Sequence, residues 1–306
     1  MKRLLAIAGS PRTAWVLLAI ALLLAVRVLV THRTQALDAV RLLDAPSLML
    51  AVLAAVVGVL CSAAKWRAIL ADLGHRVSAG ATAHIFLVGQ VGKYLPGSVW
   101  SMVTETQLAV RFGVSRRRAL ATSVTGLLVT IGSAAAVVVV TLPLRPDVGG
   151  GTRWLGLLLL PAVAVLHPAV LGRLIDSTLR VARREPLHAR TSVRGSVVAF
   201  GWGLLTWVFN GVLVFAIAHP LGLAATWRAA ALVTGGYAVA WLAGLVVVVA
   251  PVGVGVRDGA LVVVLATALP LASAIVVALV ARLVLVCVDL ALASSTALAV
   301  RWAAVG

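Results

Sequence analysis

The chain has 306 residues, of which 62% are hydrophobic and only 11% are charged. Its mean hydropathy of +1.11 is far above that of soluble globular domains, so the first question is how often the chain crosses a bilayer. The formal net charge is +17, but the basic residues stand in short runs between apolar segments. This distribution argues against a nucleic-acid-binding surface and is typical of the loops of a membrane protein.

The apolar segments predict an all-α polytopic membrane protein that forms a single integral membrane domain over residues 1–306. A spanning helix needs about 20 apolar residues. Full spans are expected at 14–30, 47–64, 119–143, 154–172, 195–218 and 272–300. The first of these is expected to be retained rather than cleaved as a signal peptide, because many further spans follow it. The polar stretch 173–194 is expected to be an amphipathic interfacial helix with a basic tail.

Two further apolar regions, 81–110 and 229–268, are interrupted by proline, glycine and charged residues. A broken helix at bilayer depth frees backbone N–H and C=O groups, which is tolerable only where protein or a water-filled cavity satisfies them. Two such breaks in corresponding halves of a chain are typical of transporter-type binding sites. We therefore expect two re-entrant helical hairpins in addition to about six full spans.

The distribution of lysine and arginine predicts the topology. Both termini, the run Arg116–Arg118 and the stretch 173–194 are expected in the cytoplasm. The first hairpin then enters from the cytoplasm and the second from outside. This makes 1–143 a first half-repeat and 154–306 an inverted second half-repeat.

The spacing of the breaks agrees with such a repeat, because Pro96 and Pro251 are 155 positions apart and the last spans of the halves, starting at 119 and 272, are 153 apart. The alternative is eight full spans, because the 22 residues of 229–250 are long enough to cross.

The first break combines residues that suit a phosphate site. Pro96 and Gly97 interrupt the helix, and Ser98 is well placed to cap the next one, whose N-terminal N–H groups would point into the break. Lys93 adds a full positive charge. Tyr94 and Trp100 have the apolar bodies and polar tips that suit headgroup depth. The alternative is an interfacial turn with Lys93 reaching the membrane surface. The candidate residues of this break are Lys93, Tyr94, Pro96, Gly97, Ser98 and Trp100.

At the second break, Gly253 and Gly255 precede Arg257 and Asp258. Arg257 can make a bidentate contact with a phosphate. Asp258 is expected to orient Arg257 or to bind an amine or a coupling cation. The alternative is that Arg257 and Asp258 form a structural ion pair, in which each neutralises the charge of the other and neither binds a ligand.

Three other intramembrane charges are candidates for the same site. Arg282 and Asp289 are seven positions apart and share one face of the last span; they either contact the site or hold helices together. Glu105 is a lone carboxylate on the helix after the first break. No metalloprotease, serine-hydrolase or nucleotide-binding motif is present in the sequence, so we expect neither an enzyme nor a metal or other cofactor.

The segments GKYLPGSVW (92–100), RFGVSRRRAL (111–120) and PVGVGVRD (251–258) resemble those of a known family, the flippase-like transmembrane region of lysylphosphatidylglycerol synthases and its stand-alone relatives. Val252 and Asp258 depart from it, since the family usually has glycine and glutamate there. The resemblance implies that Lys93, Pro96, Gly97, Trp100, Gly253, Gly255, Arg257 and Asp258 line a lipid pathway. It implies lipid translocation or handling rather than aminoacylation, because no aminoacyl-transferase domain follows the last span.

The leading hypothesis is therefore an inner-membrane protein that moves an anionic phospho- or glycolipid between leaflets, with membrane lipids as its partners. The second is a non-transporting partner or regulator of a membrane-bound lipid-modifying enzyme or glycosyltransferase. The third is a membrane-embedded lipid transferase that uses Glu105, Asp258 or Asp289 as base.

Overall fold

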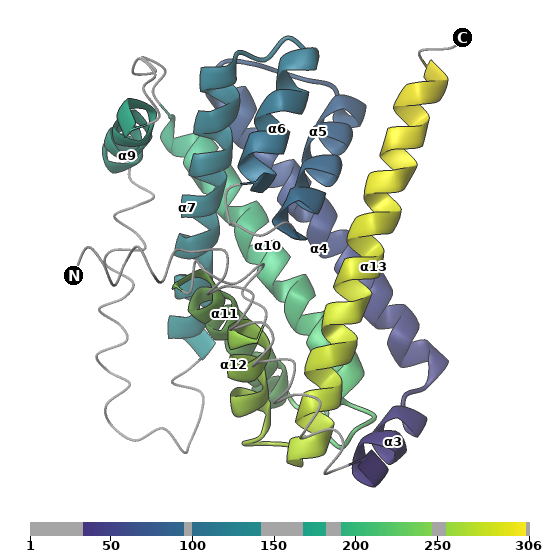
Figure 1. Ribbon diagram of the computed structural model, residues 1–306. Coiled ribbons are helices and arrows are strands. Elements are labelled where there is room, and N and C mark those ends of the chain that lie inside the picture. Colours follow the sequence, from purple (N-terminus) through teal and green to yellow (C-terminus); the bar gives the residue numbers. More distant parts are fainter. Residues whose placement is uncertain (1–32, 95–99, 142–167, 182–190, 247–254, 304–306) are drawn as a thin grey trace, which may run out of the picture.

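Helices and the turns between them make up the computed structural model over the residues that it describes, which are 33–94, 100–141, 168–181, 191–246 and 255–303 (Figure 1). In chain order these elements are α3 (Arg33–Arg41), α4 (Ala45–Asp72), α5 (Ala79–Val91), the 3-10 turn η1 (Gly92–Tyr94), α6 (Trp100–Arg111), α7 (Arg116–Thr141), α9 (Pro168–Val181), α10 (Val193–Ala218), α11 (Trp227–Val246), α12 (Val256–Leu265) and α13 (Leu271–Ala303). Among them, α4, α7, α10, α11 and α13 are long and apolar enough to cross a membrane. The predicted all-α polytopic membrane fold is confirmed.

Helices α4 and α10 form the central antiparallel pair. At one end of the pair, the Asp72 carboxylate accepts hydrogen bonds from the backbone N–H of Ser192 at 2.8 Å and from its hydroxyl at 2.5 Å. Further along, the hydroxyls of Ser62 and Thr206 lie 3.2 Å apart. Ser192 also caps α10 by accepting from the N–H of Gly195 at 2.9 Å. The C-terminal end of α4 therefore lies beside the N-terminal end of α10.

The first interrupted region is a short helical hairpin at that end of the bundle. Leu70, Val77, Phe112 and Val114 share one hydrophobic cluster, so the start of α5 and the end of α6 both lie near the end of α4. The 13 residues of α5 and the 12 of α6 are each about 20 Å long or less, against a hydrocarbon core of about 30 Å. Both arms are therefore too short to cross the hydrocarbon core.

The second interrupted region lies at the opposite end of the bundle, in the lower part of Figure 1. A Cβ placed on Gly222, just after α10, would lie 3.9 Å from Leu269, just before α13, so the segments that flank α11 and α12 meet there. Helix α12 has only ten residues and packs against α11, which has twenty. The two interrupted regions thus lie at opposite ends of the bundle. Two re-entrant hairpins in an inverted repeat stay a prediction.

The count of six full spans stays a prediction. The expected span 14–30 and most of 154–172 lie outside the described residues, and α11 is itself long enough to cross. The predicted boundary between a span ending at 172 and an interfacial helix starting at 173 is wrong, because α9 runs without a break from Pro168 to Val181. Proline suits the first turn of a helix, where its missing N–H is not needed.

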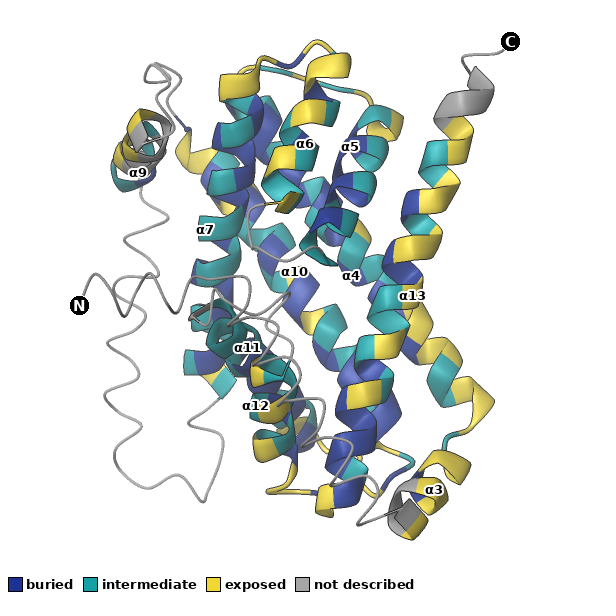
Figure 2. Ribbon diagram, in the orientation of Figure 1, coloured by how far each residue is buried: buried dark blue, intermediate teal, exposed yellow. Residues whose placement is uncertain are grey.

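Buried residues concentrate where α4, α10, α11 and α13 meet, and exposed residues lie on the outer faces of the helices (Figure 2). Many of these exposed residues are large and apolar. Leu53 on α4, Val263 on α12 and Leu283 on α13 are 59%, 70% and 63% exposed. Such a surface would be unfavourable in water but suits contact with lipid tails.

Gly92 allows the two arms of the first hairpin to approach closely. A Cβ at this position would lie 2.9 Å from backbone atoms of Trp100 and Ser101 in α6, and backbone atoms cannot turn aside. We expect Gly92→Ala to destabilise the protein by about 1–3 kcal/mol through overpacking and to lower its melting temperature in detergent. Gly80→Ala is the matched control on α5, where a Cβ meets nothing within 4 Å. Equal melting temperatures for the two variants would contradict this account of the hairpin.

Candidate functional site

The two hairpins contact the two ends of one charged stretch of α13. Arg282 and Asp289 are seven positions apart, which places them on one face about 10 Å apart along the helix axis. Asp289 contacts the first break, whereas Arg282 contacts the second. The two residues therefore have different partners, and whether they bind substrate or only hold helices together stays a prediction.

Asp289 holds the tip of the first hairpin. Its Oδ2 lies 2.6 Å from the Lys93 ammonium and accepts a hydrogen bond from the Tyr94 hydroxyl, also at 2.6 Å. The Lys93 ammonium lies 5.3 Å from the centre of the Tyr94 ring. The side chain of Asp289 is 1% exposed and that of Lys93 is 30% exposed, so the carboxylate is buried whereas the lysine is only partly buried. Within the described part of the chain, the buried Oδ1 of Asp289 has no hydrogen-bond partner.

The second break turns into α12 at Gly255. This residue has φ = +88°, a left-handed conformation that favours glycine. Its N–H donates to Oδ2 of Asp258 at 3.3 Å, which caps the start of α12. The same oxygen lies 2.5 Å from Nη1 of Arg282. Asp258 is therefore neutralised by Arg282 on α13, and not by its neighbour Arg257.

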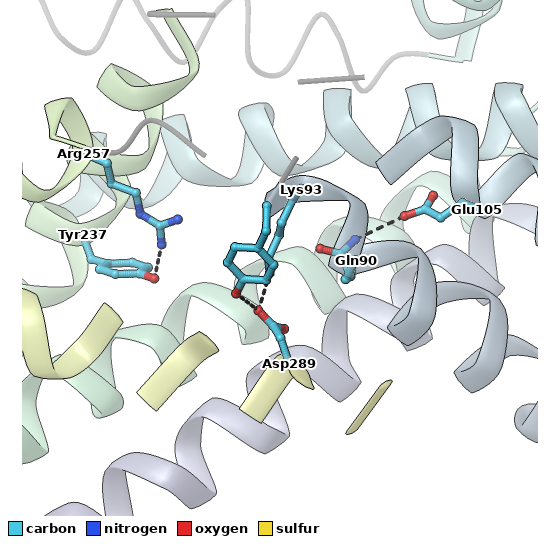
Figure 3. Close-up of polar contacts among 7 residues, drawn as sticks. Gln90, Lys93, Glu105, Tyr237, Arg257 and Asp289 are labelled. Carbon is cyan, nitrogen blue, oxygen red and sulfur yellow. Dashed lines mark hydrogen bonds and ion pairs between the residues drawn. The ribbon is translucent and has the colours of Figure 1, made fainter. Parts of the chain in front are cut away.

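Arg257 is held by an aromatic residue instead of a carboxylate. Its guanidinium donates to the Tyr237 hydroxyl on α11 and lies 4.7 Å from the centre of that ring, within cation–π range (Figure 3). Among the described residues, Arg257 has no carboxylate within 4 Å.

The described residues at the two hairpin tips carry one more positive charge than negative. The cations are Lys93, Arg257 and Arg282, and the carboxylates are Asp258 and Asp289. Two of the cations are paired with these carboxylates, which leaves the charge of Arg257 unmatched. In a low-dielectric environment an unmatched cation favours an anionic ligand.

Glu105 lies apart from this group, beyond Gln90 and on the side away from Arg257 (Figure 3). It is only 4% exposed and accepts hydrogen bonds from Ser123 at 2.5 Å and Gln90 at 3.2 Å. Lys65 is equally buried, interacts electrostatically with Glu105 and donates to Thr130 at 2.5 Å. These polar residues join α4, α5, α6 and α7. Binding of substrate by Glu105 stays a prediction.

Of the other expected site residues, Trp100 is the first residue of α6 and is 45% exposed. Pro96, Gly97, Ser98 and Gly253 lie outside the described residues. Sequence reasoning missed Tyr237. A signal was available, because the chain has only two tyrosines and both Tyr94 and Tyr237 prove to lie among the charges.

The fold and the charged tips define a class: a polytopic helical membrane protein in which two interrupted helical regions, entering from opposite ends, meet against a shared charged helix. The model of one family, the lysylphosphatidylglycerol synthase transmembrane region, matches residues 6–293. The chain belongs to this family, as its break segments predict, and it is thus a multi-pass membrane protein related to lipid handling. No curated protein matches it.

Proposed function

We propose that the protein translocates an anionic phospho- or glycolipid between the leaflets of the bacterial inner membrane and that it is not an enzyme. The observation that carries the proposal is Arg257, the cation without a carboxylate partner among the described residues, at the meeting point of the two hairpins. The family supports a role in lipid handling. Translocation itself is inferred from this geometry.

The site suits a phosphate with neighbouring polar groups. A guanidinium can bind two phosphate oxygens at once, and Tyr237 holds that of Arg257 in place. The unpartnered Oδ1 of Asp289 would accept a hydrogen bond from a hydroxyl or amine of the headgroup. The acyl tails would remain in the bilayer beside the apolar outer surface.

The opposed hairpins supply a route for alternating access. Lys93–Asp289 ties the first hairpin to α13, and Arg282–Asp258 ties the second hairpin to the same helix. A headgroup phosphate could compete for Lys93 or Arg282 and so loosen one hairpin while the other stays attached. Such gating of one repeat against the other around a central site is the general logic of inverted-repeat transporters.

Liposomes that contain the purified protein test the proposal. With a fluorescent anionic phospholipid in both leaflets and an impermeant quencher outside, protein-free vesicles lose about half of their signal. Active protein should carry the loss well beyond half, because lipid from the inner leaflet reaches the quencher. Chemical conversion of the lipid without extra quenching would instead favour a lipid transferase. If neither extra quenching nor chemical conversion is seen, the remaining hypothesis is a partner or regulator of a membrane-bound lipid-modifying enzyme or glycosyltransferase.

The orientation is a separate prediction. Arg67, Arg76, Arg111 and Arg116–Arg118 lie at the end of the bundle where α4 ends, so we expect this end and both termini to face the cytoplasm. In a variant without Cys61 and Cys287, an impermeant thiol reagent outside intact cells should label Ala225→Cys but not Arg117→Cys.

Cys61 is buried, whereas Cys287 is exposed on α13, so the removal of Cys287 matters for this experiment. External labelling at position 117 would mean that the orientation is opposite to the one predicted and that the first hairpin opens to the outside.

A further inference from the structure

We infer that a groove on the outside of the bundle, remote from the hairpin tips, binds a second lipid, an anionic phospholipid of the leaflet at the end where α4 terminates. The groove has a volume of about 560 Å³. It runs between α4, the turn after α4 and the start of α5, and one side is closed by Trp202 of α10. Its walls are mainly alanine side chains, including Ala63, Ala64, Ala68 and Ala83.

The length of the groove matches one leaflet. Its lining residues on α4 extend from Leu60 to Ala71, which is about 16 Å at 1.5 Å per residue. Half of the hydrocarbon core is about 15 Å thick. The small side chains leave room for an acyl chain over this distance, so that a chain in the groove would reach from the headgroup region to about the bilayer centre.

The arginines lie in the half of the groove nearest the end of α4, and their charge identifies the class of lipid. Arg67 and Arg76 both line the groove, both are exposed, and both lie near the end of α4. Nε of Arg67 donates to the carbonyl of Val77 at 3.3 Å. Neither arginine has a carboxylate within 4 Å among the described residues. Two guanidinium groups at headgroup depth, above an apolar channel, fit a lipid phosphate with its acyl chain below.

This lipid is distinct from the proposed substrate. Lys93, Arg257 and Asp289 are absent from the groove lining. A chain bound there would pack against α4, α5 and α10 at once and would support the outer side of the first hairpin. The groove lipid therefore does not depend on whether the protein translocates anything.

Native mass spectrometry of the detergent-purified protein tests this inference, with dioleoyl phosphatidylglycerol as the anionic probe and dioleoyl phosphatidylcholine as the zwitterionic one. Measurements in an Arg257→Gln background remove the proposed substrate site from the comparison. We expect phosphatidylglycerol to bind more tightly than phosphatidylcholine. The double variant Arg67→Gln/Arg76→Gln should bind phosphatidylglycerol at least about tenfold more weakly, because it lacks both charge-assisted contacts.

Two further variants complete the design. Arg111→Gln removes an exposed arginine at the same end of the bundle, outside the groove, and should leave binding unchanged. Ala68→Phe keeps both arginines but fills the apolar channel, and it should also weaken binding. If the double variant fails to fold, phosphatidylglycerol binding to Ala68→Phe alone tests the inference. Equal affinity for the two lipids, or wild-type binding by the variants of the groove, would overturn the inference.

Discussion

Replacing Arg257 by glutamine should slow translocation of an anionic lipid by about 10- to 100-fold. Among the described residues, no carboxylate pairs with Arg257. A charge-assisted hydrogen bond from its guanidinium to a phosphate would contribute about 1.5–3 kcal/mol. Glutamine can still donate to the Tyr237 hydroxyl but carries no charge for a phosphate. Because no ion pair is broken, the melting temperature should stay close to that of the wild type. The liposome quenching assay measures the first effect and thermal unfolding in detergent the second.

Two variants sharpen this prediction. Arg257→Lys should recover less than its charge suggests, because an ammonium lacks the planar fork of the guanidinium. Arg228→Gln is the matched control, since Arg228 also lies over an aromatic ring, 5.4 Å from the centre of Trp227, but stands exposed at the start of α11. Normal translocation by Arg257→Gln, or an equal loss in Arg228→Gln, would rule out a phosphate contact at Arg257.

Replacing Lys93 by glutamine should destabilise the protein by about 3–5 kcal/mol, because it leaves the buried Asp289 carboxylate without its cation. The sequence alone suggests a free lysine that serves only a headgroup, whose loss would affect transport but not folding. The 2.6 Å contact with a carboxylate that is 1% exposed changes this expectation. The variant should therefore show both a lower melting temperature and weaker translocation.

A double variant separates the two effects. Lys93→Gln with Asp289→Asn removes both charges and should recover much of the lost stability, since the neutral amide needs no counterion. Arg41→Gln serves as control, because Arg41 and Asp38 form an exposed pair at 3.4 Å whose loss should change stability little. If Lys93→Gln melts at the wild-type temperature, the ion pair does not hold the hairpin tip to α13.

Several elements of this protein could be predicted from the order of residues along the chain. Apolar length separates α4, α7, α10 and α13 from the short arms of the hairpins, because the bilayer imposes a minimum length on any helix that crosses it. Proline and glycine located the breaks, because few other residues interrupt helices at that depth. The sequence also pointed to Lys93, Arg257 and Asp289 as charges that need a polar neighbourhood.

The pairing of these charges could not be predicted from the sequence, because it depends on how the helices pack. Lys93 and Asp289 form an ion pair although 196 positions separate them. Asp258 pairs with Arg282 on α13 rather than with Arg257, the residue next to it in the sequence. Tyr237 contacts Arg257 although its neighbours in the sequence are uncharged, so only helix packing brings the two residues together. Glu105 lies in a separate buried cluster, where it accepts hydrogen bonds from Gln90 and Ser123. Such choices depend on the faces on which helices distant in sequence contact one another, and packing of the whole bundle sets those faces.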